Sequence, residues 1–190
     1  MIKMRRFIAV LVIAILMGTS IPRANADVEE VILQVDGLAC PFCAYGLEKK
    51  MTPIKGVKSY DVDMGEGKVY LGLDKDAKLD LEAFRKGVKE AGFTLRDVYL
   101  HAKGTIEKTD AGFALVLGPG GDRLLLFEKE AMGKKYHQGD DPKNLGLGQE
   151  LARQLEEHTG SKKEVRIEGP VHEHEGLPAG LAVEKIETLG

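Results

Sequence analysis

The hydrophobic residues in the first half of the chain change their spacing at short intervals, and each change marks a new secondary-structure element. In Glu30–Val35 the hydrophobic residues Val31, Leu33 and Val35 recur at every second position, which predicts a strand with these side chains on one face. In Phe42–Met51 they lie on one face at helical spacing, which predicts a short helix. Alternation returns in Val57–Met64 and in Lys68–Leu73, and the Glu-Gly turn between these segments predicts a hairpin.

A second helix and a fourth strand complete this half. Asp80 can cap the start of the helix and Gly92 can end it, because these residue types are favoured at those positions. Phe93–Leu100 predicts the strand that follows. The order βαββαβ is that of the ferredoxin-like fold. The hydrophobic residues of the second helix have helical spacing: Leu81, Phe84, Val88 and Ala91.

The second half has a different pattern and follows a short linker that we predict at His101–Gly104. Three strands, a helix and two strands are the order of a small OB-like barrel. We therefore predict an α+β protein, with a ferredoxin-like βαββαβ domain at 27–102 followed by an OB-like β-barrel domain at 103–190. The elements expected in this second half are the strands Gly104–Lys108, Phe113–Leu117 and Arg123–Phe127, the loop Gly133–Gly148, the helix Gln149–Glu157, and the strands Lys163–Val171 and Leu181–Ile186.

The first 26 residues have the features of a secretory signal peptide. Lys3, Arg5 and Arg6 precede the apolar segment Phe7–Met17, and residues 24–26 are Ala-Asn-Ala, a typical cleavage sequence. This apolar segment is too short for a membrane span, which needs about 20 residues. We expect cleavage after Ala26, a periplasmic or otherwise exported protein, and no membrane insertion after cleavage.

The charge of the chain narrows the choice of partners. The net charge is −3, and the loss of four basic residues with the signal peptide would lower it to −7. Nucleic acids and anionic membranes are bound by basic surfaces. The composition therefore argues against a nucleic-acid partner and is better suited to binding cations.

Cys40 and Cys43 are the only cysteines in the chain. A disulfide across so short a loop would stabilise the fold little, so the pair indicates metal binding or thiol redox chemistry. We expect Cys40 in a loop and Cys43 in the first turn of the first helix, where the helix N-terminus favours a thiolate. Two thiolates suit a soft ion, Cu(I) or Hg(II), whereas a structural zinc site would have four protein ligands.

Together with the βαββαβ pattern, the segment Gly37–Cys43 resembles the metal-binding loop of heavy-metal-associated domains. Such domains occur in copper chaperones, in metal-transporting ATPases and in the periplasmic mercury-scavenging protein. The resemblance implies a metal site at Cys40 and Cys43, no enzymatic activity, and transfer of the ion by thiol exchange to a metal transporter or metal-resistance protein. It covers about Val28–Leu100 and includes Lys55-Gly56-Val57, Gly65-Glu66-Gly67-Lys68 and Ala91-Gly92-Phe93.

The sequence departs from the family pattern around the cysteines. Leu38 stands where the family usually has Met, and it should fill the same apolar space. Ala39 stands where Thr, His or Ser is usual. Pro41 and Phe42 stand between the cysteines in place of small residues, and Pro41 removes one backbone donor. Phe93 stands where a Lys or Tyr is often found, so no cation at that position offsets the charge of two thiolates.

The alternative interpretation of the Cys-Pro-Phe-Cys motif is a periplasmic thiol-disulfide oxidoreductase. A thioredoxin-like domain, however, has a proline facing its dithiol well downstream, and residues 54–118 contain no proline. We therefore favour metal binding. His172 and His174 would share one face of a strand and are a weaker metal-binding candidate, for which an exposed polar strand end is the favoured interpretation.

Overall fold

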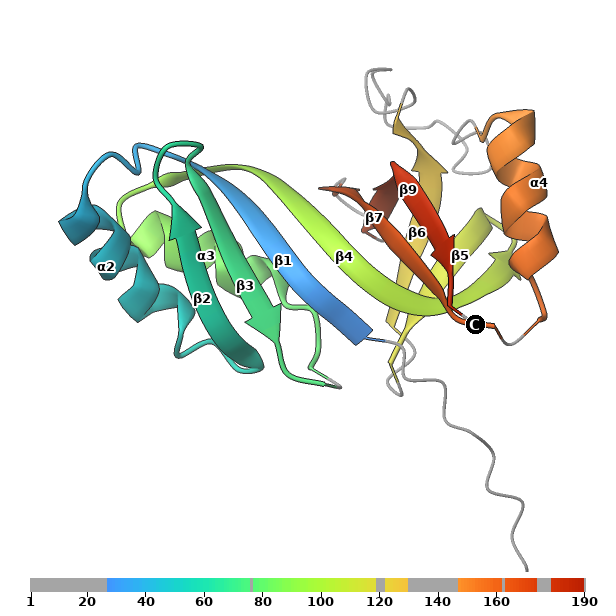
Figure 1. The fold of residues 1–190 in the computed structure, drawn as a ribbon, viewed down its shortest axis with the longest axis horizontal. Helices are drawn as coiled ribbons and strands as arrows, with labels where there is room; N and C mark the ends of the chain where they lie inside the picture. Colours follow the sequence, from blue (N-terminus) through green and yellow to red (C-terminus); the bar gives the residue numbers. More distant parts are fainter. Residues whose placement is uncertain are drawn as a thin grey trace, which may run out of the picture.

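The computed structural model describes residues 27–75, 77–118, 122–129, 147–161, 163–173 and 179–189 of the 190-residue chain. The segment expected to be a signal peptide and most of the loop expected at Gly133–Gly148 lie outside these residues. Figure 1 shows two lobes, with one long strand running through both. The elements are β1 (Asp27–Asp36), α2 (Pro41–Met51), β2 (Val57–Asp63), β3 (Lys68–Leu73), α3 (Leu81–Glu90), β4 (Thr94–Thr109), β5 (Gly112–Leu117), β6 (Asp122–Glu128), α4 (Gln149–His158), β7 (Val165–His172), β8 (Gly180–Val183) and β9 (Lys185–Thr188).

The first lobe is an antiparallel sheet in the order β2-β3-β1-β4, with α2 and α3 on one face (Figure 1). Alternate residues of β1 are buried, because a strand turns successive side chains to opposite faces. The core of this lobe combines strand residues such as Leu33 with Leu47 and Met51 of α2 and Phe84 of α3. The predicted ferredoxin-like βαββαβ order is confirmed.

Helix α3 begins and ends as predicted. The carboxylate of Asp80 accepts a hydrogen bond of 2.9 Å from the N–H of Ala83, which caps the helix. Gly92 follows the helix with a φ of 86°, a conformation that glycine adopts without steric cost. Gly87 allows α2 to pack closely, because a Cβ at this position would collide with the methyl group of Met51. Helix α3 thus supports the helix that follows the cysteine loop.

The predicted linker at His101–Gly104 is wrong, because these residues lie inside the 16-residue strand β4. β4 pairs with β1 on one side and with β7 on the other along this stretch. Ala102 and Gly104 are small and buried, and a Cβ at Gly104 would collide with the carbonyl oxygen of Val116. Small residues that suggested a flexible connection are therefore needed for close packing between strands.

The strands of the second lobe pair in a closed ring in the order β4-β5-β6-β8-β7-β4. The pairing of β6 with β8 is parallel, and the other pairings in the ring are antiparallel. Helix α4 lies between β6 and β7 in sequence, and its Leu155 is buried in the hydrophobic core. The ring and the first lobe share β4, and buried residues of both lobes form one continuous hydrophobic core.

The last expected strand, Leu181–Ile186, is two strands that meet at Glu184. β8 pairs with β6 and with the end of β7, whereas β9 pairs with the beginning of β7 alone. The N–H of Glu184 donates to the carbonyl of Glu168 at 3.0 Å. Gly169 has no side chain at this crossing, and a Cβ there would collide with the carbonyl of Ala182. Because β8 and β9 pair with different parts of β7, the single strand that was expected is divided at Glu184.

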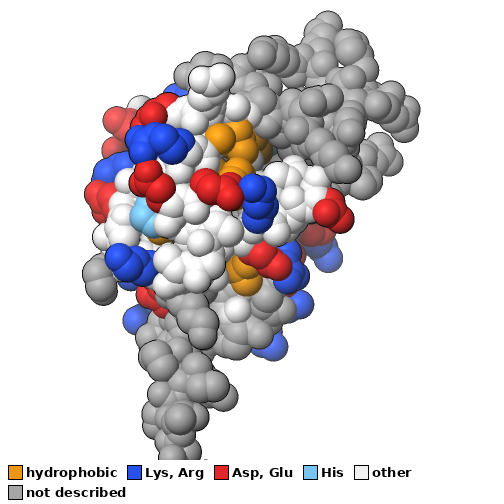
Figure 2. Space-filling model, turned by 90° about the vertical axis from the view of Figure 1, so that its right-hand side faces the viewer, with side chains coloured by type: hydrophobic (Ala, Val, Ile, Leu, Met, Phe, Trp, Pro, Cys, Tyr) orange, Lys and Arg blue, Asp and Glu red, His pale blue; other side chains and the backbone are white. Residues whose placement is uncertain are grey.

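Charged side chains of both signs are interspersed on the face of the second lobe that Figure 2 shows, and the hydrophobic areas between them are small. Some of these oppositely charged side chains form ion pairs with one another. Arg153 of α4 pairs with Glu150 at 2.7 Å and also with Glu157, and Lys108 of β4 pairs with Glu156 at 2.9 Å. No helix within the described ranges has the length and apolar character that crossing a membrane requires.

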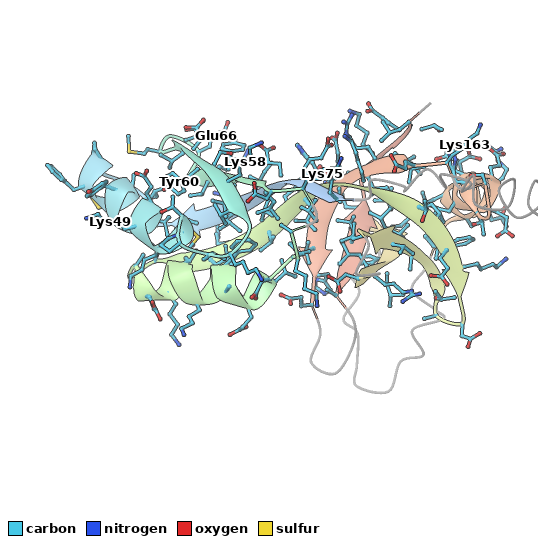
Figure 3. The ribbon with its side chains drawn as sticks, turned by 90° about the horizontal axis from the view of Figure 1, so that it is seen from below. Lys49, Lys58, Tyr60, Glu66, Lys75 and Lys163 are labelled. Carbon is cyan, nitrogen blue, oxygen red and sulfur yellow. A yellow bond between two sulfur atoms is a disulfide. The ribbon has the colours of Figure 1, made fainter. Side chains whose placement is uncertain are left out.

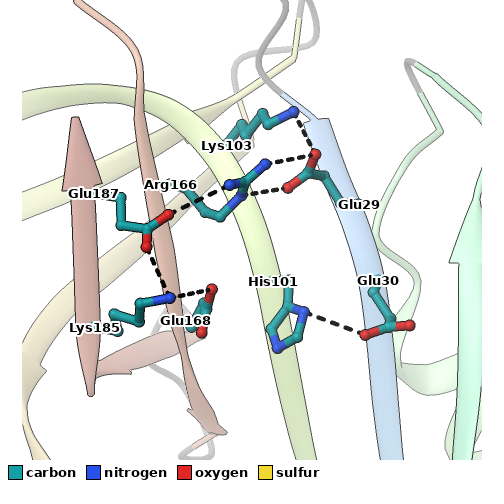
Figure 4. Close-up of polar contacts among 8 residues, drawn as sticks. All are labelled: Glu29, Glu30, His101, Lys103, Arg166, Glu168, Lys185 and Glu187. Atoms are coloured by element: carbon teal, nitrogen blue, oxygen red, sulfur yellow. Dashed lines mark hydrogen bonds and ion pairs between the residues drawn. The ribbon is translucent and has the colours of Figure 1, made fainter. Parts of the chain in front are cut away.

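A network of charged side chains joins the two lobes across β1, β4, β7 and β9 (Figure 4). Arg166 of β7 donates to Glu29 of β1 at 2.7 and 3.3 Å and to Glu187 of β9 at 3.4 Å. Lys103 of β4 pairs with the same Glu29 carboxylate. These contacts and the shared strand β4 connect the two lobes.

Candidate metal site

Cys40 and Cys43 lie at the N-terminus of α2, where the sequence places them. Cys40 is the N-cap residue, with φ −144° and ψ 149°, and Pro41 begins the helix. The N–H of Cys43 donates to the sulfur of Cys40 at 3.2 Å, so this sulfur acts as the capping acceptor that an oxygen usually provides. The Cα atoms are 5.2 Å apart, and the sulfur atoms are joined in a disulfide.

The loop before the helix is held by its neighbours in the core. Gly37 has a φ of 89°, which disfavours any residue with a side chain. Leu38 is buried, as predicted, and its side chain belongs to the hydrophobic core. Phe93 lies beside Gly37, and a Cβ on that glycine would be 3.6 Å from the Phe93 ring. The apolar anchors on both sides of the loop therefore fix the backbone that leads into Cys40.

The side chains around the cysteines are open to solvent. Both cysteines are half-buried, whereas Phe42 between them is 87% exposed and Tyr45 is 55% exposed. Lys49 lies one turn further along α2, and its ammonium group is 4.6 Å from the centre of the Tyr45 ring. The site is thus bordered by aromatic rings that another protein could contact directly.

The start of α2 favours anionic sulfur. A helix N-terminus has unpaired N–H groups and partial positive charge, which lower the pKa of a thiol placed there. The first turn of α2 contains no acidic residue, so no carboxylate on that turn opposes the charge of a thiolate. After reduction of the disulfide, the geometry would present two thiolates at one point of the surface.

Tyr60 of β2 contacts the first turn of α2, and the sequence analysis missed this contact. Its hydroxyl donates to the carbonyl of Ala44 at 3.2 Å. Burial, with smaller contributions from Glu48 and Asp61, raises the pKa of the Tyr60 hydroxyl to about 12, so the hydroxyl stays protonated at neutral pH. A tyrosine at an inward position of a strand was the available signal, since a buried tyrosine hydroxyl usually has a hydrogen-bond partner.

Among the residues that the structure describes, His101 and His172 contact groups away from this site. His172 ends β7 and lies edge-on to Phe127, with ring centroids 6.2 Å apart, and His174 lies outside the described residues. His101 contacts Glu30 at 3.2 Å in the sheet shared by the lobes. Within the residues that the structure describes, no group of three or more His, Cys, Asp or Glu side chains is arranged to hold a metal ion.

Comparisons with known proteins agree with the geometry of the first lobe. A family model described as the heavy-metal-associated domain matches residues 32–94, which include Cys40 and Cys43. Copper chaperone CopZ of Staphylococcus aureus (strain Newman) is 31% identical over 62 residues, which are 33% of this chain and 90% of that protein. Copper chaperone CopZ of Staphylococcus saprophyticus is 27% identical over 64 residues, which are 34% of this chain and 93% of that protein.

Among solved structures, one named CopZ metallochaperone is 28% identical, with a TM-score of 0.33, and the match covers 35% of this chain and 98% of that one. Residues 32–94, which the family model matches, lie in the first lobe, and the two CopZ proteins are matched over nearly their full length. Through this lobe, which is homologous to copper chaperones, the chain belongs to the heavy-metal-associated domain family.

Proposed function

We propose that this protein binds one soft metal ion, Cu(I) or Hg(II), between the thiolates of Cys40 and Cys43 and passes it to a partner protein. The observation that carries the proposal is the position of both sulfurs at the N-terminus of α2, with the Cα atoms 5.2 Å apart and the Cys43 N–H directed at Cys40. Soft cations prefer thiolate ligands, and two of them converge here.

The relatives support Cu(I) over Hg(II) as the cargo, because the curated proteins that match are named copper chaperones. They do not support the alternative of a thiol-disulfide oxidoreductase. A metal-carrying role also uses no chemistry beyond ligand exchange, so we propose that the protein is not an enzyme.

Transfer of the ion would proceed by exchange of thiolates. A thiolate of the partner binds the ion, one of the two cysteines leaves it, and a second exchange completes the transfer without changing the oxidation state of the metal. The exposed rings of Phe42 and Tyr45 favour this step, since aromatic side chains are common anchors in protein interfaces. A metal transporter or a metal-resistance protein is the partner that we propose.

We further propose that residues 1–26 direct export and that the protein works in the periplasm or another exported location. Such compartments are oxidising, so the Cys40–Cys43 disulfide must accept two electrons and two protons before the thiols can bind metal. A periplasmic reductant of the thioredoxin-like class would supply these electrons.

For the second lobe we propose an OB-like module with a separate interaction role. The ring order β4-β5-β6-β8-β7, the parallel pairing of β6 with β8 and the position of α4 between β6 and β7 support this assignment. The mixed charge on this lobe gives no support for nucleic-acid binding.

The test is an anaerobic titration of the reduced protein with Cu(I), Hg(II) and Zn(II), followed by native mass spectrometry. We expect one tightly bound Cu(I) or Hg(II) per chain and weaker binding of Zn(II). A Cys40→Ser, Cys43→Ser double variant should lose the tight site. Stoichiometric tight binding in that variant would contradict the assignment to these two cysteines.

A further inference from the structure

The hydrogen bond from Tyr60 ends next to the metal site rather than at an arbitrary point of α2. Figure 3 labels Tyr60, which lies on β2 beside α2. Its ring packs against the hydrophobic core, and its hydroxyl reaches the carbonyl of Ala44, the residue that directly follows Cys43. The side chain therefore links β2, the edge strand of the first lobe, to the first turn of the cysteine-bearing helix.

Ala44 is bonded in two directions. Its N–H donates to the carbonyl of Cys40 at 3.1 Å, which closes the first turn of α2. Its carbonyl accepts the hydrogen bond from Tyr60 at 3.2 Å. Cys40 is thus connected to β2 through two consecutive hydrogen bonds, one from Ala44 to Cys40 and one from Tyr60 to Ala44. Cys43 lies between Cys40 and Ala44 in the sequence.

The Tyr60 hydroxyl keeps its proton and can donate a hydrogen bond at neutral pH. Burial raises its pKa to about 12, well above that pH. Ala44 is itself buried, so water competes little for its carbonyl. The contact should therefore persist in both the reduced and the metal-bound protein.

We infer that Tyr60 is a positioning residue of the metal site, which holds the first turn of α2 against β2 and so keeps the sulfurs of Cys40 and Cys43 convergent. The inference rests on the proposed metal-binding function. Tyr60 does not touch the ion, and its effect passes through Ala44. Loss of its hydroxyl should let the first turn open more often, so that the ion dissociates faster.

The experiment compares Tyr60→Phe with Thr52→Val. Tyr60→Phe keeps the buried ring and removes only the hydroxyl. Thr52→Val is a matched control, because the Thr52 hydroxyl also donates to a carbonyl of α2, that of Glu48 at 2.9 Å, but at the end of the helix away from the cysteines. The dissociation constant for Cu(I) is measured by competition with a chromophoric chelator, and the release rate by stopped flow.

We expect Tyr60→Phe to weaken Cu(I) binding by about fivefold, the size expected for one hydrogen bond of about 1 kcal/mol, mainly through faster release. Thr52→Val should bind Cu(I) like the wild type. Equal weakening in both variants would show a general effect of helix stability and overturn the inference, as would an unchanged dissociation constant in Tyr60→Phe.

A metal-free measurement separates this inference from the proposed function. In the fully reduced proteins, the ratio of the alkylation rates of Cys40 and Cys43 is determined by mass spectrometry. We expect this ratio to change in Tyr60→Phe and not in Thr52→Val. If the wild type binds no soft metal, the proposed function fails, and the alkylation ratio alone decides whether Tyr60 positions the cysteines: an unchanged ratio then overturns the inference.

Discussion

The carboxylate of Glu29 on β1 accepts a hydrogen bond of 2.7 Å from Arg166 on β7, although the two residues are 137 positions apart in the sequence. The contact joins the first strand of the metal-binding lobe to the ring of the second lobe. Burial alone would raise the pKa of the Glu29 carboxyl, but hydrogen bonds from Arg166 and Lys103 outweigh it and hold the pKa below its ordinary value. Folding is therefore favoured when this carboxylate is charged.

This relationship predicts an acid-dependent part of the stability. Since the pKa of Glu29 is lower in the folded protein, the unfolded state binds the proton first, and the contribution of Glu29 is lost as pH falls through the folded pKa. We expect the melting temperature of Glu29→Gln to fall less steeply between about pH 6 and pH 3 than that of the wild type. Glu107→Gln, which removes an exposed pair with Arg123 within the second lobe, is the control. Identical slopes for the wild type and Glu29→Gln would refute the prediction.

The first lobe should fold and bind metal without the second. The relatives match it over 90% or more of their own length, which supports an independent unit. A fragment of residues 27–102 should bind Cu(I) within about tenfold of the whole chain, a difference of about 1.4 kcal/mol. We also expect the fragment to be less stable, because the edge of β4 from Tyr99 onward loses its pairing with β7. Circular dichroism and Cu(I) competition measure both effects, and aggregation of the fragment would count against the prediction.

Alanine should stabilise the protein more at Gly46 than at Gly87, two glycines in neighbouring helices. A Cβ at Gly46 in α2 would meet no other atom within 4 Å, so Gly46→Ala should stabilise the protein by about 0.5–1 kcal/mol through helix propensity. Gly87→Ala in α3 should gain less stability than Gly46→Ala, because the added Cβ would lie 2.3 Å from the terminal methyl group of the buried Met51, which must move. Denaturant titrations of both variants give the comparison, and a destabilised Gly46→Ala would be the contrary result.

The cysteines should be oxidised in cells that lack the metal. A thiol pair at a helix N-terminus is readily oxidised, and Cys40 and Cys43 form a disulfide in the structure. We expect a sizeable fraction of the apo protein to carry the disulfide, and bound metal to protect the thiols. Rapid lysis with an alkylating agent, with and without added copper, followed by mass analysis, measures the fraction. Fully reduced cysteines in metal-starved cells would show that a dedicated reductant guards the pair.

Much of the first lobe could be predicted from the sequence, because its elements have strong local signals. The strand Lys68–Leu73 has the predicted bounds, and α3 is capped by Asp80 and followed by Gly92 as expected. The position of Cys40 before the first helix and of Cys43 in its first turn also followed from local rules, since Pro41 favours the first helical position. Periodicity and capping depend on residues that are only a few positions apart, so both can be recognised from the sequence alone.

Only the tertiary structure decided the features that depend on distant segments. The small residues at His101–Gly104 indicated a linker, but the pairing of β4 with both β1 and β7 makes this stretch the centre of a sheet. The closure of the ring through the parallel pair β6 and β8, and the contact from Tyr60 to Ala44, are likewise absent from any local pattern. The physical reason is that backbone hydrogen bonds between strands and burial against a neighbouring element are set by which segments meet in space, and hydrophobic periodicity records only which face of a segment is buried.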